Sequence, residues 1–590
     1  MGNTDPAVPS VDLQAFLRGI DLFAPLGAAG IAELAGELEI RTLPGGAVLF
    51  DQGDAADALY IVRSGGLAAY RRDAEAALTL LGMIGSGEVA GEISLIARTA
   101  RTSLVRALRD SIVLRLSADA FHRLVGKYPQ AMLHTVGVTA RHLLERPGQV
   151  HYSTPRTFAI LAHDAGVDAQ GFARDLAAAL SRYGSCALID ATAARRRDVA
   201  WLHEIEATHR YVLLLGDAGQ TAWREQCARQ ADAFLLPVNA ADTASAWPEV
   251  AFINAERVAL RTRHLVLLHQ GDIGLGRAAA WLAQLRGARH HHVRGGSAVA
   301  DTERIARLLI GRSMGLVLSG GGARGFAQIG IVHALREGGQ QIDCVGGTSI
   351  GAIIGAGVAL DWSGEEMFYN YRRAFVEGRP LRDYTFPFVS LTRGRRVARL
   401  LREAFGERDV TDLPLPFYAV TANLTAGAAQ VHQAGPLWLW LRAASAIPGV
   451  LPPVFHRGEV YVDGAVINNL PVDPMRAMQV GDVIGIDIGA DDVLRAQVEE
   501  FALPSALRLA WQRLHRRGLR PGILNILLRA GMVNSEAASA ARRAQTSLLL
   551  APPMHDIGLL DWDEYERAIA AGYRYAREVL GRGAKPRSLP

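Results

Sequence analysis

The stretch LVLSGGGARGFAQIGIVHAL, residues 316–335, decides how the second half of this chain folds. A short apolar run leads into three consecutive glycines, and apolar residues at helical spacing follow them. A strand, a tight glycine turn and a helix in this order are typical of an α/β fold. The backbone amides of such a turn lie at a helix N-terminus, where they stabilise negative charge on a phosphate or on a developing oxyanion.

Two uses of this turn are compatible with its glycines. Gly320, Gly322 and Gly325 have the G-x-G-x-x-G spacing of a dinucleotide-binding turn, which requires an acidic residue at the end of the following strand. Asp343 lies at about the right distance, but it stands at the beginning of that strand. The sequence therefore favours an oxyanion site over a cofactor site.

The segment IDCVGGTSIGAIIGAG, residues 342–357, supplies a candidate nucleophile. Its G-x-S-x-G motif stands between a strand-like run and a helix-like run, which is the context of a nucleophile elbow. Small residues on both sides of the serine relieve crowding in that strained turn. We therefore predict Ser349 as the nucleophile, with Gly347 and Gly351 as the small residues of the elbow.

A nucleophilic serine needs a base, and the segment GEVYVDGAVINNLPV, residues 458–472, offers Asp463 at the end of a short strand. Desolvation raises the pKa of a carboxyl group, which makes its carboxylate a better acceptor for the serine proton. The alternative is that Asp463 only caps an Asp-Gly turn. His456 is a second candidate base, but the chain order Ser, His, Asp is not that of an α/β-hydrolase triad. We expect His456 in the loop over the site.

The first half of the chain carries a different pattern. Residues 41–72 alternate short apolar segments with glycines, which predicts a small antiparallel barrel. The stretch GEVAGEISLIARTARTSLVRA, residues 87–107, then interrupts the strands with one helical turn. Its amides, arginine and hydroxyls can hold a cyclic phosphate, and its glutamate can accept a hydrogen bond from a ribose. The alternative is a structural barrel in which the arginine and the glutamate are solvated or paired with each other.

The motifs of the second half carry a family resemblance. The patterns G-G-G-x-R-G, G-x-S-x-G and D-G-A, in this order, resemble the patatin-like phospholipase family over about residues 315–480. The resemblance implies hydrolysis of acyl esters in phospholipids or lysophospholipids through a Ser-Asp dyad and an acyl-enzyme, with no metal and no cofactor for catalysis. The residues it implies are the nucleophile Ser349, the base Asp463 and the oxyanion loop Gly320, Gly321, Gly322 and Arg324.

Residues from about 20 to 135 resemble a cyclic-nucleotide-binding domain, with 91–103 as its phosphate-binding cassette. This resemblance implies cAMP or cGMP as a regulatory ligand, and a helix at 118–149 that such a ligand moves. The binding residues it implies are Gly91, Glu92, Arg101, Thr102 and Ser103.

Between these two regions, residues 155–310 alternate apolar runs with helical stretches, which predicts a parallel α/β sheet. They contain no G-x-x-x-x-G-K-[ST] loop, so a nucleotide triphosphatase is not supported. The region is similar to the linker domain of neuropathy target esterase-like proteins. We interpret its histidine run, residues 290–292, as a solvated loop.

The predicted fold class is therefore multidomain. It comprises an N-terminal β-barrel cyclic-nucleotide-binding domain at 16–140, an α/β linker domain at 155–310, an α/β patatin-like hydrolase domain at 315–480 and a C-terminal helical extension at 481–590. Within the extension, residues 498–533 alternate apolar residues with arginines. This pattern fits both a helix attached to an anionic membrane surface and a helix packed on the catalytic domain.

Composition narrows the partners and the compartment. A formal net charge of +4 over 590 residues gives no indication of a nucleic-acid partner. Three widely separated cysteines indicate neither a disulfide framework nor a zinc site. The N-terminus lacks the apolar core of a secretion signal, and the apolar runs are shorter than the ~20 residues that span a bilayer. We expect a cytoplasmic protein whose membrane contact is peripheral, on the inner membrane face.

A competing hypothesis from another class is a cyclic-nucleotide sensor whose hydrolase domain is an inactive scaffold. An activated serine distinguishes the two hypotheses, because only the enzyme should react with a fluorophosphonate. The sequence leaves the oligomeric state, the acyl chain and the head group open.

Overall fold

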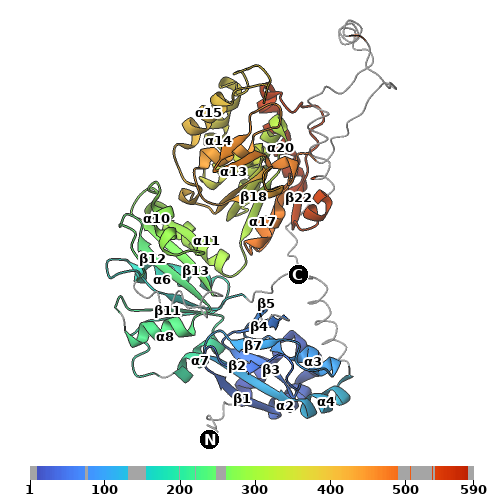
Figure 1. Ribbon diagram of the computed structural model, residues 1–590. Coiled ribbons are helices and arrows are strands. Elements are labelled where there is room, and N and C mark those ends of the chain that lie inside the picture. Colours follow the sequence, from blue (N-terminus) through green and yellow to red (C-terminus); the bar gives the residue numbers. More distant parts are fainter. Residues whose placement is uncertain are drawn as a thin grey trace. The chain divides into compact units, whose positions relative to one another are not determined.

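Figure 1 shows the computed structural model of the chain. It describes residues 10–73, 77–129, 154–197, 199–219, 221–247, 261–489 and 538–581, together with positions 505 and 535. The chain divides into two compact units. One unit comprises residues 1–268, 284–289 and 297–310, and the other comprises residues 269–283, 290–296 and 311–590.

The first unit begins with the predicted barrel, made of two four-stranded antiparallel sheets. Their strand orders are β1-β8-β3-β6 and β2-β7-β4-β5. β3 is buried along its whole length because it lies inside the first sheet and faces the helices on one side and the barrel core on the other. The strands are β1 (Leu38–Leu43), β2 (Val48–Phe50), β3 (Ala58–Ser64), β4 (Leu67–Arg72), β5 (Leu78–Ile84), β6 (Val89–Ala90), β7 (Leu104–Ala107) and β8 (Ser111–Ser117).

Helices close one side of this barrel. Apolar side chains such as Leu17, Leu34 and Leu124 form one core with Leu59 and Leu114 of the sheet. The helices are α1 (Ser10–Arg18), η1 (Asp21–Leu26), α2 (Gly27–Gly36), α3 (Glu92–Ala97) and α4 (Ala118–Lys127). The helix predicted at 118–149 begins as expected, but α4 ends at Lys127, because Tyr128 has non-helical backbone angles. Residues 130–149 lie outside the described residues.

The middle region forms a six-stranded sheet with the order β10-β11-β9-β12-β13-β14. The pairs β10–β11, β11–β9, β9–β12 and β12–β13 are parallel. Continuous apolar runs form the central strands, as expected for a parallel sheet covered on both faces. The strands are β9 (Thr157–Ile160), β10 (Cys186–Ile189), β11 (Tyr211–Leu215), β12 (Ala233–Asn239), β13 (Thr262–His269) and β14 (Arg289–Arg294), and the helices are α6 (Ala169–Ser181), α7 (Val199–Thr208), α8 (Ala222–Gln230), α10 (Arg277–Gln284), η2 (Gly295–Ser297) and α11 (Ala298–Leu309).

The interpretation of residues 290–292 as a solvated loop is wrong. These histidines lie in β14, and His291 and His292 are buried. The two ring nitrogens of His292 lie 2.8 Å from Nε2 of His269 and 2.9 Å from the carbonyl oxygen of Thr411. Hydrogen bonds to both ring nitrogens compensate for the loss of water, which is why a polar run can form a buried strand.

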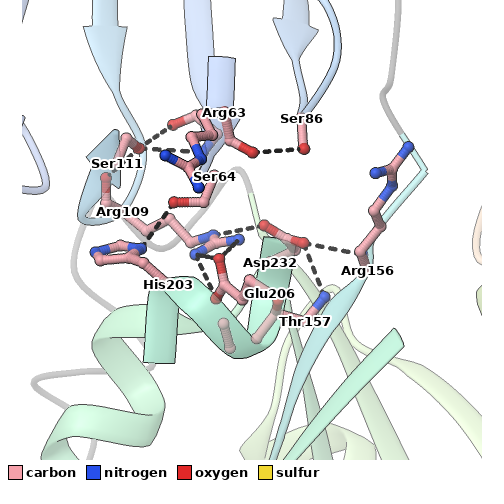
Figure 2. A network of polar contacts seen from close by, with 12 residues as sticks. Arg63, Ser64, Ser86, Arg109, Ser111, Arg156, Thr157, His203, Glu206 and Asp232 are labelled. Atoms are coloured by element: carbon pink, nitrogen blue, oxygen red, sulfur yellow. Dashed lines mark hydrogen bonds and ion pairs between the residues drawn. The ribbon is translucent and has the colours of Figure 1, made fainter. Parts of the chain in front are cut away.

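A buried charge network joins the barrel to the middle domain within the first unit (Figure 2). Arg109, in the turn between β7 and β8, donates from Nε to Asp232 (2.6 Å) and from Nη1 to Glu206 (3.0 Å). Nearby, Oγ of Ser64 lies 2.7 Å from Nδ1 of His203. The side chains of Arg109 and Glu206 are both nearly inaccessible to water, so displacing this turn would leave buried charges uncompensated.

The second unit is built around an eight-stranded mixed sheet. Its main strand order is β19-β20-β17-β16-β15-β21-β22, and β18 pairs with β17. β15, β16, β17, β21 and β22 are parallel to one another, whereas β18, β19 and β20 pair antiparallel to their neighbours. The strands are β15 (Met314–Leu318), β16 (Cys344–Thr348), β17 (Phe417–Asn423), β18 (Ala428–His432), β19 (Val454–His456), β20 (Glu459–Asp463), β21 (Asp482–Ile486) and β22 (Leu548–Leu550).

Helices cover this sheet and complete its core. The longer ones are α12 (Ala327–Glu337), α13 (Ile350–Ala359), α14 (Gly364–Tyr371), α15 (Arg395–Phe405), α16 (Leu437–Ala444), α17 (Val472–Ala477) and α20 (Tyr565–Gly581). The 3-10 and π-helical segments are η3 (Gly322–Phe326), η4 (Arg372–Glu377), η5 (Val410–Asp412), η6 (Gly464–Val466) and η7 (Trp562–Glu564). α20 packs directly on α12, where a Cβ atom on Gly330 would lie 2.0 Å from the carbonyl oxygen of Ile569. Glycine at position 330 therefore permits this close approach of the two helix backbones.

The segment predicted as a C-terminal helical extension, residues 481–590, is not purely helical, because β21 and β22 belong to the main sheet of the second unit. β22 continues the sheet next to β21, and α20 contributes Tyr565, Ala568 and Ala576 to the main core. We therefore propose that the hydrolase domain reaches residue 581. The arginine-rich segment at 498–533 lies outside the described residues, apart from position 505. Among the residues that the structure describes, no helix is long and apolar enough to cross a membrane.

Candidate active site

The two glycine motifs meet at one edge of the sheet in the second unit. β15 ends at Leu318, immediately before the glycine loop, and β16 ends at Thr348, immediately before Ser349. β15 and β16 are parallel neighbours in register, so the residues that follow them emerge side by side. The carboxyl edge of a parallel sheet is where α/β proteins place their ligand sites.

Ser349 occupies a strained turn between β16 and α13. Its backbone angles are φ 56° and ψ −131°, which L side chains rarely adopt. A Cβ atom on Gly347 would lie 2.6 Å from the carbonyl carbon of Gly351, and one on Gly351 would lie 2.4 Å from the carbonyl oxygen of Leu318. Only glycine fits at both positions, so the residue types of the motif follow from the space around the elbow.

Asp463 lies against the serine. Oγ of Ser349 donates to Oδ2 of Asp463 at 2.6 Å, and the Ala465 amide donates to Oδ1 at 2.9 Å. Burial raises the pKa of Asp463 to about 7, although both hydrogen bonds act in the opposite direction. This carboxyl group therefore titrates near neutral pH, where a proton acceptor is most effective.

The predicted oxyanion loop runs beside this pair. Gly320 lies so close to the serine that a Cβ atom there would lie 2.9 Å from Cβ of Ser349. Its amide already donates to the side-chain oxygen of Asn469 at 3.1 Å, which removes Gly320 from the set of free donors. Gly321 and Gly322 form the N-terminus of η3, and no side chain among the described residues caps that turn. Their amides are thus the remaining main-chain candidates for oxyanion contacts.

The loop is held from two directions. Asn469 binds the Gly320 amide, and its own amide donates to Ser535 at 2.9 Å. On the other side, the Ala323 amide donates to the carbonyl oxygen of Leu559 at 2.8 Å, and Nε of Arg324 donates to that of Ile557. This contact indicates that Arg324 fixes the loop. Asn469 was missed as a site residue, although the Asn-Asn pair that follows the D-G-A motif is a visible signal.

Histidines lie near the site without joining the dyad. His456 ends β19 and packs edge-on against Trp440, with ring centroids 5.4 Å apart. Nε2 of His432 lies 2.8 Å from Oγ1 of Thr421, which is the β17 partner of Asp463. Burial lowers the pKa of His432 to about 4. Among the described residues, no histidine is hydrogen-bonded to Ser349 or Asp463.

The predicted phosphate-binding cassette of the first unit is arranged differently. Gly91 has φ +88° and precedes α3, which begins with Glu92. The Arg101 side chain is buried and donates to the carbonyl oxygens of Gly91 (3.1 Å) and Ala58 (2.6 Å), and to Asp57 (3.2 Å).

The other cassette residues differ in exposure. Thr102 is exposed and Ser103 is half-buried. Burial raises the pKa of Glu92, against the opposing effect of Arg101. The structure thus brings the predicted cassette residues to one region, in which the Arg101 side chain is bonded to main-chain carbonyl oxygens of the barrel and to Asp57.

Comparison with known proteins gives three family-model matches along the chain. A cyclic nucleotide-binding domain matches residues 40–128, and a neuropathy target esterase family P-loop like domain matches residues 154–308. A patatin-like phospholipase domain matches residues 316–476. Their order is the order predicted from the sequence.

Curated relatives share this organisation over most of the chain. Patatin-like phospholipase domain-containing protein 7 of Mus musculus is 30% identical over 92% of this chain and 45% of its own length. Lysophospholipase nte1 of Aspergillus niger is 28% identical over 94% of this chain and 42% of its own length. An uncharacterized NTE family protein of Mycobacterium bovis is 29% identical over 98% of this chain and 97% of its own length. The chain thus spans about half the length of the first two relatives.

These matches define the class: a multidomain α/β protein that carries a cyclic nucleotide-binding β domain ahead of a patatin-like phospholipase domain. Within that class, the chain carries the domain set of neuropathy target esterase family proteins and is similar to the Mycobacterium bovis family member over nearly the whole length of both chains. The predicted resemblance and fold class are confirmed. The family placement supports a lipid ester hydrolase.

Proposed function

We propose that this protein hydrolyses acyl esters of phospholipids or lysophospholipids through a Ser349–Asp463 dyad and an acyl-enzyme. The observation that carries the proposal is the 2.6 Å hydrogen bond from Oγ of Ser349 to Asp463. This hydrogen bond joins the hydroxyl of a serine on a strained elbow to a buried carboxylate whose pKa is raised to about 7, which supports the roles of nucleophile and base. The domain match and the phospholipase and lysophospholipase relatives supply the substrate class.

The proposed reaction proceeds in two halves. Asp463 accepts the hydroxyl proton while Oγ of Ser349 attacks the ester carbonyl carbon, and the charge on the carbonyl oxygen is taken up by the amides of Gly321 and Gly322. Asp463 then returns the proton to the departing alcohol, leaving the acyl group on the serine. A water molecule gives its proton to Asp463 and attacks the acyl carbon, after which the serine leaves with that proton.

Ser349→Ala is the direct test of this mechanism. We expect loss of p-nitrophenyl ester and lysophospholipid turnover by roughly 10³-fold or more, because no other nucleophile replaces the serine. Labelling by a fluorophosphonate should vanish with it. Ser363→Ala, which alters the exposed cap of α14, is the control and should label like the wild type. If the wild type neither reacts with the fluorophosphonate nor turns over an ester, the domain is a binding scaffold.

We also propose cAMP or cGMP as a regulatory ligand of residues 91–103. The cyclic nucleotide-binding domain match supports this ligand class. The Arg109 network supports a route for its effect, because the turn between β7 and β8 is tied to α7 and to the start of β12 (Figure 2). The test is turnover by the full chain with and without each nucleotide, together with calorimetric binding. Binding without any change in rate would refute regulation.

A location follows from the proposed substrate. We propose that the protein acts in the cytoplasm with peripheral contact to the inner membrane face. Fractionation of cells that express the full chain tests this location, and salt washing separates peripheral attachment from integral attachment.

A further inference from the structure

An exposed aromatic hairpin projects from the second unit. Residues 383–393 form it, with Tyr384 bridged to Thr392 and the Thr385 amide donating to the carbonyl oxygen of Leu391 at 3.0 Å. At its tip, Phe386 is 73% exposed and Phe388 is 87% exposed. Their rings lie 4.8 Å apart and so form a single apolar surface. The remaining exposed apolar side chains of the hairpin are Tyr384, Val389 and Leu391.

The flanks of the aromatic hairpin are strongly basic. Residues 378–396 contain five arginines against a single acidic residue, Asp383. Four of the arginines have exposed side chains, and among the described residues none of these four forms an ion pair. They are Arg379, Arg382, Arg393 and Arg395. Exposed aromatic side chains rimmed by unpaired cations are complementary to an apolar layer covered by anionic head groups.

The base of the hairpin is bonded to the segment that positions the dyad. The amides of Leu391 and Thr392 donate to the carbonyl oxygens of Gly449 (2.8 Å) and Val450 (3.1 Å). Three residues earlier, the carbonyl oxygen of Ala446 accepts the Asp463 amide at 3.0 Å. One turn, residues 446–450, therefore holds both the hairpin and the proposed base.

We propose that the aromatic hairpin is the part of the hydrolase domain that enters an anionic phospholipid surface. Phe386 and Phe388 reach the boundary between head groups and acyl chains, while the flanking arginines pair with lipid phosphates. This docking places the lipid layer next to the 446–450 turn, from which Asp463 is held. The inference rests on the proposed function, because the docked lipid layer is then the source of the substrate.

Vesicle co-sedimentation of the full chain tests the docking. We expect Phe386→Ser/Phe388→Ser to bind vesicles of phosphatidylglycerol and phosphatidylcholine at least tenfold more weakly than the wild type. Arg379→Gln/Arg382→Gln/Arg393→Gln should lose a similar factor on these vesicles, with a shallower dependence on salt. The matched control is Leu275→Ser/Val299→Ser, which changes two exposed apolar residues elsewhere and should bind like the wild type. Melting temperatures show whether each variant is folded.

The Ser349→Ala variant separates docking from catalysis. It should bind vesicles as tightly as the wild type while it hydrolyses no ester, because Ser349 lies outside the hairpin. A wild type that binds vesicles but hydrolyses no lipid would overturn the proposed function and leave the docking intact. Wild-type binding by a folded Phe386→Ser/Phe388→Ser variant would overturn the docking. A wild type that does not bind vesicles would also overturn it. The same holds if the wild type is a dimer and the Phe386→Ser/Phe388→Ser variant is a monomer, because a second copy of the chain would then cover the hairpin. Light scattering measures that last outcome.

Discussion

The two sites that the sequence predicts, around Ser349 and around Arg101, differ in how they are assembled. At Ser349 the elbow, the carboxylate and the glycine loop are placed by main-chain geometry, and the key hydrogen bond is present. At Arg101 the central group is a long charged side chain that bonds to the carbonyl oxygens of Gly91 and Ala58. The arrangement around Ser349 forms when the chain folds, because the main chain positions it. At Arg101, a ligand can bind only when the arginine exchanges its protein acceptors for acceptors of the ligand.

The largest expected effect concerns the proposed dyad, because the hydrogen bond between Ser349 and Asp463 is present in the folded protein. Asp463→Asn should lower kcat/KM for a soluble ester by roughly 10³-fold or more, because an amide cannot accept the serine proton. In the wild type, kcat/KM should rise with pH up to about 7, the pKa to which burial raises Asp463, since only the ionised form is a base. Steady-state kinetics over pH 5–9 measure both. Activity that is independent of pH across this range would contradict the assignment.

The same substitution, Asp463→Asn, should stabilise the folded protein although it lowers the activity. Because the pKa of Asp463 is raised on folding, the folded protein holds the proton more tightly than the unfolded chain does. Stability from this group is full below about pH 4 and is lost as the pH rises through about 7. Asp463→Asn removes this loss, so the variant should unfold at a higher temperature than the wild type at pH 8. At high pH, the ionised Asp463 lowers the free energy of unfolding of the wild type by on the order of 4 kcal/mol.

A smaller effect is expected at Asn469, which supports the loop without belonging to the dyad. Asn469→Ala should reduce kcat by about 10-fold to 100-fold with little change in KM, because the amide of Gly320 loses its side-chain acceptor, keeps only the longer 3.4 Å contact with the main-chain carbonyl oxygen of residue 469, and the neighbouring donors shift. Asn239→Ala removes an asparagine that binds backbone in the first unit and is the matched control. An equal loss in both variants would indicate a general effect of the substitution.

A further effect is expected at Arg101, in the predicted cyclic-nucleotide site. Arg101→Gln should destabilise the barrel by about 2 kcal/mol, because two carbonyl oxygens and Asp57 lose their donor. It should also abolish binding of cAMP and cGMP. Urea unfolding and calorimetry measure the two effects. A variant that binds nucleotide as well as the wild type would show that the arginine serves the fold alone.

The smallest effect is expected at Asp57, an exposed acceptor that competes for Arg101. Asp57→Asn weakens that competition and should raise cyclic-nucleotide affinity by about two-fold to five-fold, the range expected for one exposed ion pair. Asp51→Asn, on a different exposed arginine pair of the barrel, is the control. Lower affinity in the Asp57 variant would mean that Asp57 positions the arginine for its ligand.

Local pattern was sufficient to predict the elbow, the glycine turn and the individual barrel strands, because turns and strands are encoded by residues that are close in the sequence. The turn around Ser349 needs glycine two residues away on either side, and that spacing is visible in one short segment. By contrast, the pairing of β22 with β21 and the packing of α20 on α12 depend on contacts between distant segments. The burial of His292 likewise depends on His269 and Thr411, which no local pattern connects. The Arg101 side chain bonds to carbonyl oxygens inside the barrel, and the sequence alone does not show which of several possible acceptors it prefers.

The brace on the glycine loop has a consequence for biosynthesis. Arg324 and its acceptor on Ile557 are 233 residues apart, and the acceptor of the Ala323 amide, on Leu559, is synthesised equally late. A ribosome can therefore expose the whole elbow and its carboxylate while the loop still lacks its support. With the proposed function, a growing chain should have no esterase activity until translation has passed residue 559.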